Sequence, residues 1–229
     1  MPVWQEFFER HRTNRFTLLS IAVDVQGPEV VTPWIKKYGV TFPVAVDTAD
    51  IFGAAFGLKA IPVSFLVDEV GIIRLQGGGP SKEFLAQVEE ILREPVSTVR
   101  SQTRESATAM SLDELRAQVA RTSSDADARL ALAQALERAG DYQAAFVECE
   151  AAARLRPSDA TIPFTHGLVL LRQGKTNEAL VKLTQARDLD AGNWRIRKQI
   201  WALEHPDKFY GTNGIDWGWQ KEQIAREKK

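Results

Sequence analysis

Residues 57–79 read GLKAIPVSFLVDEVGIIRLQGGG, and they contain two β-rich runs separated by a turn signal. The runs cover residues 61–67 and 72–76, where Val, Ile, Phe and Leu predominate. Asp68 to Gly71 lie between them, and a short polar segment ending in glycine is typical of a hairpin connection. We therefore predict an antiparallel hairpin here.

The residues on either side of this hairpin indicate an α/β domain over residues 1–94. The runs with strand character are mostly apolar, as in strands buried on both faces. Helical segments alternate with them, and Ser81 is a suitable N-cap for the last one. The predicted strands are 16–24 and 42–47, and the predicted helices are 27–39, 48–57 and 81–94. A further amphipathic helix begins at once, within MPVWQEFFERHR (residues 1–12), and no strand comes before it.

Residues 126–159 and 160–193 repeat each other with a period of 34 residues. The same residue type stands at four matched positions of the two segments. These pairs are Gly140 and Gly174, Ala145 and Ala179, Ala152 and Ala186, and Leu155 and Leu189. This period is that of the helix–turn–helix tetratricopeptide repeat, in which small residues let two helices pack closely. We predict two such repeats.

Stacked repeats need covering helices at both ends. A capping box at Ser111 and Glu114 begins a helix at one end, and residues 193–204 form a helix at the other. The predicted domains are thus 1–94 (α/β) and 111–204 (all-α repeats), with a polar linker at 95–110 and an aromatic and charged tail at 205–229. The tail either packs back on the protein or binds a partner.

Composition excludes several functional classes. The net charge of −1 provides no global attraction to nucleic acid or to anionic lipid. No apolar run reaches the roughly 18 residues that span a bilayer. The three histidines lie far apart and lack metal-ligand spacing, so we predict no metal site and no cofactor.

The stretches AIPVSFLVD (60–68), FPVAVD (42–47) and FGLKAIP (56–62), with the Asp68–Gly71 turn, resemble the redoxin branch of the thioredoxin fold. The similarity is to TlpA/ResA-type thiol–disulfide oxidoreductases, which are related to the AhpC/TSA group. The tail at 200–225 also resembles the ends of redoxin–tetratricopeptide proteins. The resemblance implies a cis-proline at Pro62, where Ile61, Pro62 and Val63 would bind an extended substrate peptide. The alternative is an ordinary trans turn proline.

The sequence departs from this family at its catalytic motif. The family's Cys-x-x-Cys precedes a Met-Pro or similar pair, which matches Met1-Pro2 here, so the dithiol would fall upstream of residue 1. A helix N-terminus lowers the pKa of the first cysteine, and the second resolves the mixed disulfide. This chain has one cysteine, Cys149, which falls on the packing side of a predicted repeat helix. We predict an inert core residue and no catalytic residue in this chain.

The resemblance also places the family's central strand upstream of residue 1. The predicted strands at 16–24 and 62–67 would then each present a bare edge inside the core. Unpaired buried backbone groups cost about 1–3 kcal/mol each. Three outcomes follow: the chain is a fragment, the remaining strands close up in another order, or another chain supplies the strand. The fragment is the interpretation that the sequence favours.

Two functional hypotheses result. The first is a redoxin-type oxidoreductase family protein whose tetratricopeptide module recruits protein partners, with this chain inactive in redox chemistry. The second is a non-enzymatic tetratricopeptide adaptor that uses a degenerate thioredoxin-like domain only as a scaffold for protein binding. The positions predicted to face the repeat groove are Gln134, Arg138, Phe164 and Arg172, the alternative being a solvated helical face. The resemblance implies an extracytoplasmic bacterial setting.

Overall fold

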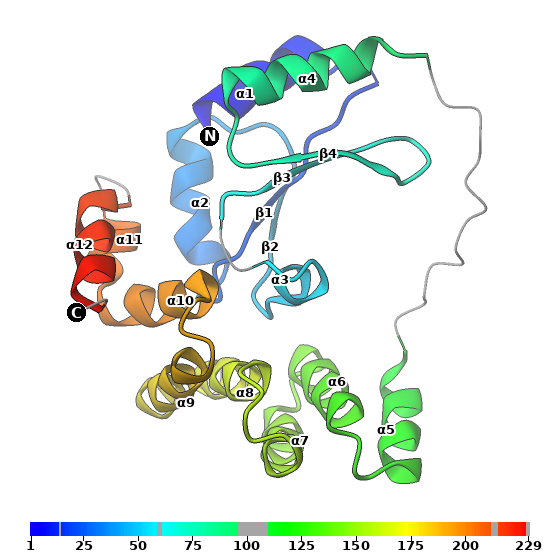
Figure 1. The fold of residues 1–229 in the computed structure, drawn as a ribbon, viewed down its shortest axis with the longest axis vertical. Coiled ribbons are helices and arrows are strands. Elements are labelled where there is room, and N and C mark those ends of the chain that lie inside the picture. The colour runs from blue at the N-terminus through cyan, green and yellow to red at the C-terminus, as the bar shows by residue number, and fades with distance from the viewer. Residues whose placement is uncertain (14, 59–60, 96–109, 212–214, 228–229) are drawn as a thin grey trace. The chain divides into compact units, whose positions relative to one another are not determined.

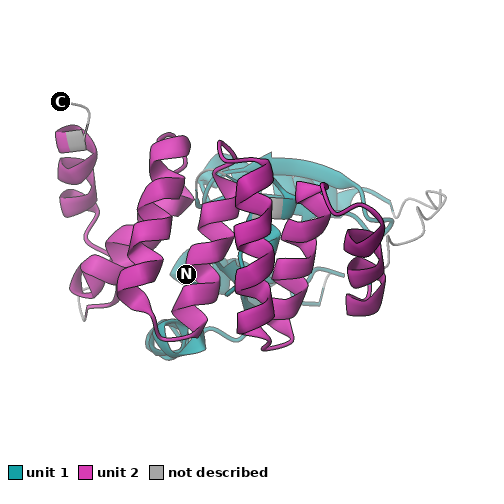
Figure 2. Ribbon diagram, turned by 90° about the horizontal axis from the view of Figure 1, so that it is seen from below, with its two compact units in different colours: residues 1–110 teal, residues 111–229 magenta. Residues whose placement is uncertain are grey.

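The structure, a computed structural model, describes residues 1–13, 15–58, 61–95, 110–211 and 215–227. The chain divides into two compact units, Met1–Met110 and Ser111–Lys229, which are traced in Figure 1 and coloured separately in Figure 2. Most of the predicted linker at 95–110 lies outside the described residues.

Unit 1 alternates helices and short strands, as predicted from its sequence pattern. Its described strands form two separate two-stranded sheets, β1–β2 parallel and β3–β4 antiparallel. The elements are α1 (Pro2–His11), β1 (Ser20–Ala22), α2 (Pro28–Lys37), β2 (Val44–Val46), α3 (Ile51–Ala55), β3 (Ser64–Val67), β4 (Ile73–Gly77) and α4 (Lys82–Arg93).

The hairpin predicted at residues 61–76 is confirmed. The Asp68 N–H donates to Ile72 O at 2.9 Å, and the Asp68 carboxylate accepts from the Val70 and Ile72 N–H groups at 3.1 and 2.8 Å. An aspartate that bonds to the backbone two residues further on stabilises this kind of turn. Gly71 has a φ of +86°, a conformation that suits glycine.

The first strand is shorter than predicted. The sequence predicts a strand over residues 16–24, but only Ser20–Ala22 form one, with β2 as partner. An apolar run becomes a strand only where a neighbouring backbone accepts and donates hydrogen bonds. Among the described residues β1 is not paired with β3, so the two sheets do not join.

Unit 2 is helical. Its elements are α5 (Leu112–Arg121), α6 (Ala126–Arg138), α7 (Tyr142–Leu155), α8 (Thr161–Arg172), α9 (Thr176–Leu189), α10 (Trp194–Glu204), α11 (Pro206–Tyr210) and α12 (Trp217–Glu227). Consecutive helices from α5 to α10 pack on one another, and they are labelled in Figure 1. The helices α6–α7 and α8–α9 form two hairpins with the predicted spacing.

The repeated glycines and alanines have the roles that their spacing indicates. Gly140 and Gly174 end α6 and α8 with φ values of +81° and +73°, the left-handed conformation that glycine favours after a helix. The four repeated alanines, Ala145, Ala152, Ala179 and Ala186, are each 0% exposed. Their small side chains let the helices of each hairpin, and of neighbouring hairpins, approach closely.

The ends of the repeat are covered as expected. The capping box at Ser111 and Glu114 is present at the start of α5, whose Leu115 and Val119 pack on the first hairpin. In the tail, Phe209 and Trp219 form an aromatic cluster with Trp201 of α10. Large aromatic side chains gain free energy by such burial, and the packing interpretation of the tail holds for these residues.

Candidate functional site

A cleft of about 1040 Å³ opens in unit 1 between β1 and β3. Every residue of both strands lines it, whereas among the described residues β2 contributes none and β4 contributes only Arg74. Successive side chains of a strand point to opposite faces. A surface lined by consecutive residues is therefore the backbone edge of the strand. The edges of two sheets thus face the same cleft.

Aromatic and aliphatic side chains line the cleft on both sides of these edges. Phe52 of α3 and Phe56, which follows that helix, stack with ring centroids 4.4 Å apart, and Phe56 lies 5.1 Å from Phe65 of β3. From α1 and α4, Trp4 and Phe84 meet edge to face with centroids 6.2 Å apart. Most of the residues that line the cleft are consequently apolar.

The three residues predicted to bind substrate all lie at this cleft. The Ile61–Pro62 peptide bond is cis, which confirms the predicted isomer. Ile61, Pro62 and Val63 line the cleft immediately before β3. Their part in binding stays a prediction, but the structure does bring them together on an accessible surface: Pro62 is exposed, and Ile61 and Val63 are half-buried.

Charged groups gather at the end of the cleft where β3 turns into β4. The Arg74 guanidinium lies 2.7 Å from Glu94 and 3.8 Å from Asp68. The hydrogen bond that Arg74 donates to Glu94, together with the charges of Glu94, Asp68 and Glu69, raises the pKa of Arg74 above its usual value. Three carboxylates against one guanidinium make this end of the cleft negative.

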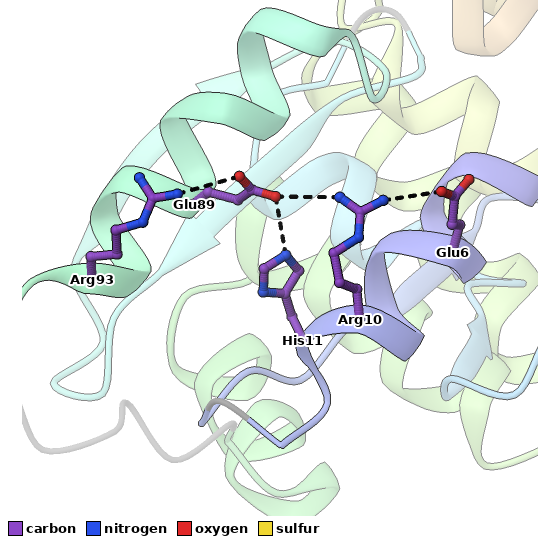
Figure 3. A network of polar contacts seen from close by, with 5 residues as sticks. All are labelled: Glu6, Arg10, His11, Glu89 and Arg93. Carbon is purple, nitrogen blue, oxygen red and sulfur yellow. Dashed lines mark hydrogen bonds and ion pairs between the residues drawn. The ribbon is translucent and has the colours of Figure 1, made fainter.

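A polar network attaches the end of α1 to α4, as Figure 3 shows. Glu89 of α4 accepts from His11 Nε2 at 3.2 Å and from Arg10 at 3.5 Å, and Arg10 also pairs with Glu6 at 3.0 Å. Exposed ion pairs of this kind contribute little stability. The main attachment is Phe7, 2% exposed and packed with Phe84 and Val88. His11 therefore contacts α4 through Glu89.

In unit 2, the predicted groove residues have different environments. Arg138 is exposed and Gln134 half-buried. The Arg172 Nε donates to Glu137 Oε1 at 3.0 Å. Phe164 is only 3% exposed, and the Arg195 guanidinium lies 5.9 Å from its ring centroid. All residues of α8 from Ile162 to Leu170 are buried, so Phe164 offers little surface in this state. Partner binding by the four residues stays a prediction.

Cys149 lies in the interior of unit 2. It is 0% exposed, and burial, followed by the charge of Glu150, raises the pKa of its thiol to about 12. The thiolate is the nucleophile in disulfide exchange. At neutral pH this cysteine is therefore protonated and inaccessible, as predicted.

The sequence pattern does not reveal the buried polar group that His166 forms with Glu150 and Lys182. His166 is 1% exposed, with Nδ1 3.4 Å from Glu150 Oε1, and Lys182 Nζ lies 3.2 Å from the same oxygen. Burial, with Lys182 adding to it and Glu150 opposing it, lowers the pKa of His166 to about 4. The three residues lie on α7, α8 and α9, and only the folded hairpins bring them together.

Over the described ranges, no group of three His, Cys, Asp or Glu side chains has the arrangement of a metal site. Nor do the helices that the structure describes include one with the length and apolar character needed to cross a bilayer.

Comparison with known proteins identifies relatives of unit 1. Residues 1–76 match the model of the AhpC/TSA family. Thiol-disulfide oxidoreductase ResA of Halalkalibacterium halodurans is 28% identical over 95 residues, which are 41% of this chain and 53% of the relative. Sporulation thiol-disulfide oxidoreductase A of Bacillus subtilis is 29% identical over 82 residues, 35% of this chain and 50% of the relative. The chain spans about half the length of these curated relatives.

Among solved structures, the type III secretion translocator chaperone SycD of Yersinia enterocolitica aligns with a TM-score of 0.40 and 21% identity, covering 43% of this chain and 80% of the chaperone. SycD in complex with a peptide of the translocator YopD aligns with a TM-score of 0.39 and 20% identity, covering 42% and 79%.

Proposed function

Starting from the AhpC/TSA match of residues 1–76, we propose that this chain is a thioredoxin-like protein of the thiol–disulfide oxidoreductase type that binds other polypeptides. Unit 1 would hold an extended peptide at Ile61, Pro62 and Val63. Unit 2 would act as a tetratricopeptide-type interaction module. The chain itself would bind without catalysing disulfide exchange.

The proposal that this chain does not catalyse disulfide exchange rests on the state of Cys149, its single cysteine. Dithiol exchange requires an accessible thiolate and a second thiol to resolve the mixed disulfide. Cys149 is buried among α6, α7 and α8 side chains, and its pKa is raised to about 12. It supplies neither group. On this proposal the chain serves recognition, and Cys149 takes no part in disulfide exchange.

Insulin reduction by dithiothreitol tests this part of the proposal. We expect the chain to accelerate precipitation of the insulin B chain no more than a Cys149→Ala variant or buffer does. A rate above buffer that the variant loses would show that Cys149 reacts, and would contradict the proposal.

Peptide binding at Val63 is tested separately by Val63→Asp, which should weaken binding of an unfolded, reduced and alkylated substrate protein.

The 34-residue repeat supports the proposed module. In unit 2 two hairpins recur with glycine turns and buried alanines at matched positions, the arrangement that tetratricopeptide proteins use to present a binding groove. Gln134, Arg138 and Arg172 are the positions to substitute, since none of the three is fully buried. Charge reversal at Arg138 should weaken capture of a partner without unfolding the unit.

The second candidate is the non-enzymatic adaptor. The buried state of Cys149 supports the adaptor as well as it supports an oxidoreductase-type protein that is inactive in this chain. The nucleotide sequence upstream of the codon for Met1 separates the two. An in-frame Cys-x-x-Cys preceded by a β-rich run would support an oxidoreductase, and a nearby stop codon would support the adaptor. The extracytoplasmic setting that the family resemblance implies also stays a prediction.

A further inference from the structure

A smaller cavity lies in unit 2, where α7, α8 and α9 meet. Its volume is about 180 Å³, the space of roughly six water molecules at about 30 Å³ each. None of the residues predicted to face the repeat groove belongs to its lining. The cavity is therefore a separate site, and what it binds is independent of the peptide binding proposed above.

Cations outnumber carboxylates in the lining of this cavity. The lining contains one carboxylate, that of Glu150, and three basic side chains, those of Arg154, Arg156 and Lys182. Lys182 Nζ lies 3.2 Å from Glu150 Oε1, and Arg156 pairs with two aspartates outside the lining. Arg154 is exposed and makes no ion pair with any residue that the structure describes. An anion that enters the cavity would thus meet an unpaired guanidinium.

His166 contributes a buried imidazole to the same lining. Its side chain is 1% exposed, and its Nδ1 lies 3.4 Å from Glu150 Oε1. Its Nε2 is buried and has no hydrogen-bond partner among the described residues. Buried polar atoms without a partner are uncommon in folded proteins. A ligand that bonds to Nε2 would supply the missing partner.

The contact with Glu150 defines which partner Nε2 can accept. A carboxylate accepts hydrogen bonds, so the proton of the neutral imidazole lies on Nδ1 and Nε2 is left as an acceptor. Burial, with Lys182 adding to it and Glu150 opposing it, lowers the pKa of His166 to about 4, and the ring is therefore neutral at pH 6. The partner that Nε2 lacks is a hydrogen-bond donor, whereas Arg154 and Lys182 attract negative charge.

We propose that this cavity binds a small oxyanion that retains an acidic proton, and a monoanionic phosphate group has this chemistry. Its charged oxygens would accept hydrogen bonds from Arg154 and Lys182, and its hydroxyl group would donate to His166 Nε2. Arginine and lysine are common phosphate-binding side chains. Inorganic phosphate and the phosphate group of a monoester both meet these requirements.

Sulfate has a similar shape and charge distribution but no proton to donate. It would bond to Nε2 only after His166 itself has taken up a proton. With a pKa of about 4 for His166, this uptake disfavours sulfate by a factor of about 100 at pH 6. The preference for phosphate over sulfate is therefore the property that distinguishes this site from a general attraction of anions to basic side chains.

Isothermal titration calorimetry of the full chain with phosphate and with sulfate, at pH 6 and equal ionic strength, tests the proposal. We expect phosphate to bind at least tenfold more tightly than sulfate. A parallel titration with phosphoserine distinguishes the sources, since tighter binding than that of inorganic phosphate assigns the site to a monoester and weaker binding assigns it to the free ion. Equal affinity for phosphate and sulfate, or no phosphate binding at millimolar concentration, would show that the proposal is wrong.

An arginine pair locates the anion. Arg154→Gln should weaken phosphate binding at least fivefold, because it removes the unpaired cation of the lining. Arg116→Gln is the matched control, with the same change of charge at an exposed residue of α5 outside the cavity, and should leave the affinity unchanged. If both variants have the same effect, the anion binds elsewhere and the proposal is contradicted.

His166→Gln examines the part played by Nε2. The glutamine side chain has both a donor and an acceptor, so this variant should bind phosphate and sulfate with affinities within about threefold of each other. Its circular dichroism spectrum at pH 6 reports whether unit 2 is folded, and the Arg154→Gln comparison decides the question if it is not. A folded variant that still prefers phosphate tenfold would mean that His166 does not contact the anion, and would overturn the proposal.

Discussion

At the scale of single residues, His166 shows how tertiary contacts change an ionisable group. Its ring is buried against Phe146, with centroids 4.6 Å apart and the planes nearly perpendicular. Lys182 and Glu150 lie on the neighbouring helices α9 and α7. Removal from water and the lysine charge both disfavour the imidazolium, and they outweigh the carboxylate.

His166 should make unit 2 less stable as the pH falls from 6.5 toward 4. The folded pKa of about 4 lies below the unfolded value of 6.5, so between these values the unfolded state binds more protons than the folded state. The free energy of unfolding then decreases by about 1.4 kcal/mol per pH unit, or about 2 kcal/mol at pH 5. Urea denaturation at pH 7 and pH 5 measures this loss.

His166→Gln should remove this part of the pH dependence, while His205→Gln, at an exposed position, should preserve it. For wild type and the two variants, the change in the free energy of unfolding between pH 7 and pH 5 is compared. The carboxylates that all three proteins share contribute equally to each change, so their titration cancels. An identical difference between pH 7 and pH 5 in wild type and His166→Gln would contradict the assignment.

At the scale of elements, the α8–α9 hairpin depends on a close approach at Gly167. A Cβ at this position would lie 2.9 Å from Leu183 Cγ and 3.3 Å from Ala179 O. Leu183 is itself 0% exposed and cannot move aside freely. The corresponding position of the first hairpin holds Ala133, also 0% exposed, so the two hairpins pack differently despite their shared pattern.

Gly167→Ala should destabilise unit 2 by about 1–2 kcal/mol, because overpacking outweighs the gain in helix propensity. Thermal or urea denaturation followed at 222 nm would measure the change. Gly192→Ala is the matched control: its Cβ would meet only Asp190 Oδ1 at 3.9 Å, and we expect a change close to zero. Stabilisation by Gly167→Ala would show that the helices separate more easily than the contacts indicate.

At the scale of the whole molecule, the two units have separate cores. Phe7, Phe84 and Val88 centre the core of unit 1, and Ala145, Cys149 and Val169 belong to that of unit 2. Leu183→Ala, at a 0% exposed residue of α9, should cost unit 2 about 2–5 kcal/mol through the cavity it leaves.

Hydrogen–deuterium exchange locates this effect. We expect faster exchange in peptides from α8 and α9 of Leu183→Ala and unchanged exchange in peptides from β3 and β4. Val181→Ala, at a residue 68% exposed on the same helix, should change neither. Equal acceleration in both units of Leu183→Ala would mean that they unfold as one cooperative body.

Local signals determined much of this protein from the sequence alone. Ser81 and Ser111 cap the helices they were predicted to begin, Asp68 and Gly71 make the predicted hairpin turn, and Gly140 and Gly174 end the helices where the repeat places them. Capping, turn and glycine preferences act over a few residues, so the sequence contains them directly.

Only the tertiary structure decided which strand edges meet across the cleft and which side chains surround His166. The apolar run at 16–24 looks like one long strand, yet pairing is limited to Ser20–Ala22 because hydrogen bonds need a partner backbone. The pKa of His166 likewise depends on Glu150 and Lys182, brought together by three helices. Both properties arise from contacts between residues far apart in the chain, which no local pattern specifies.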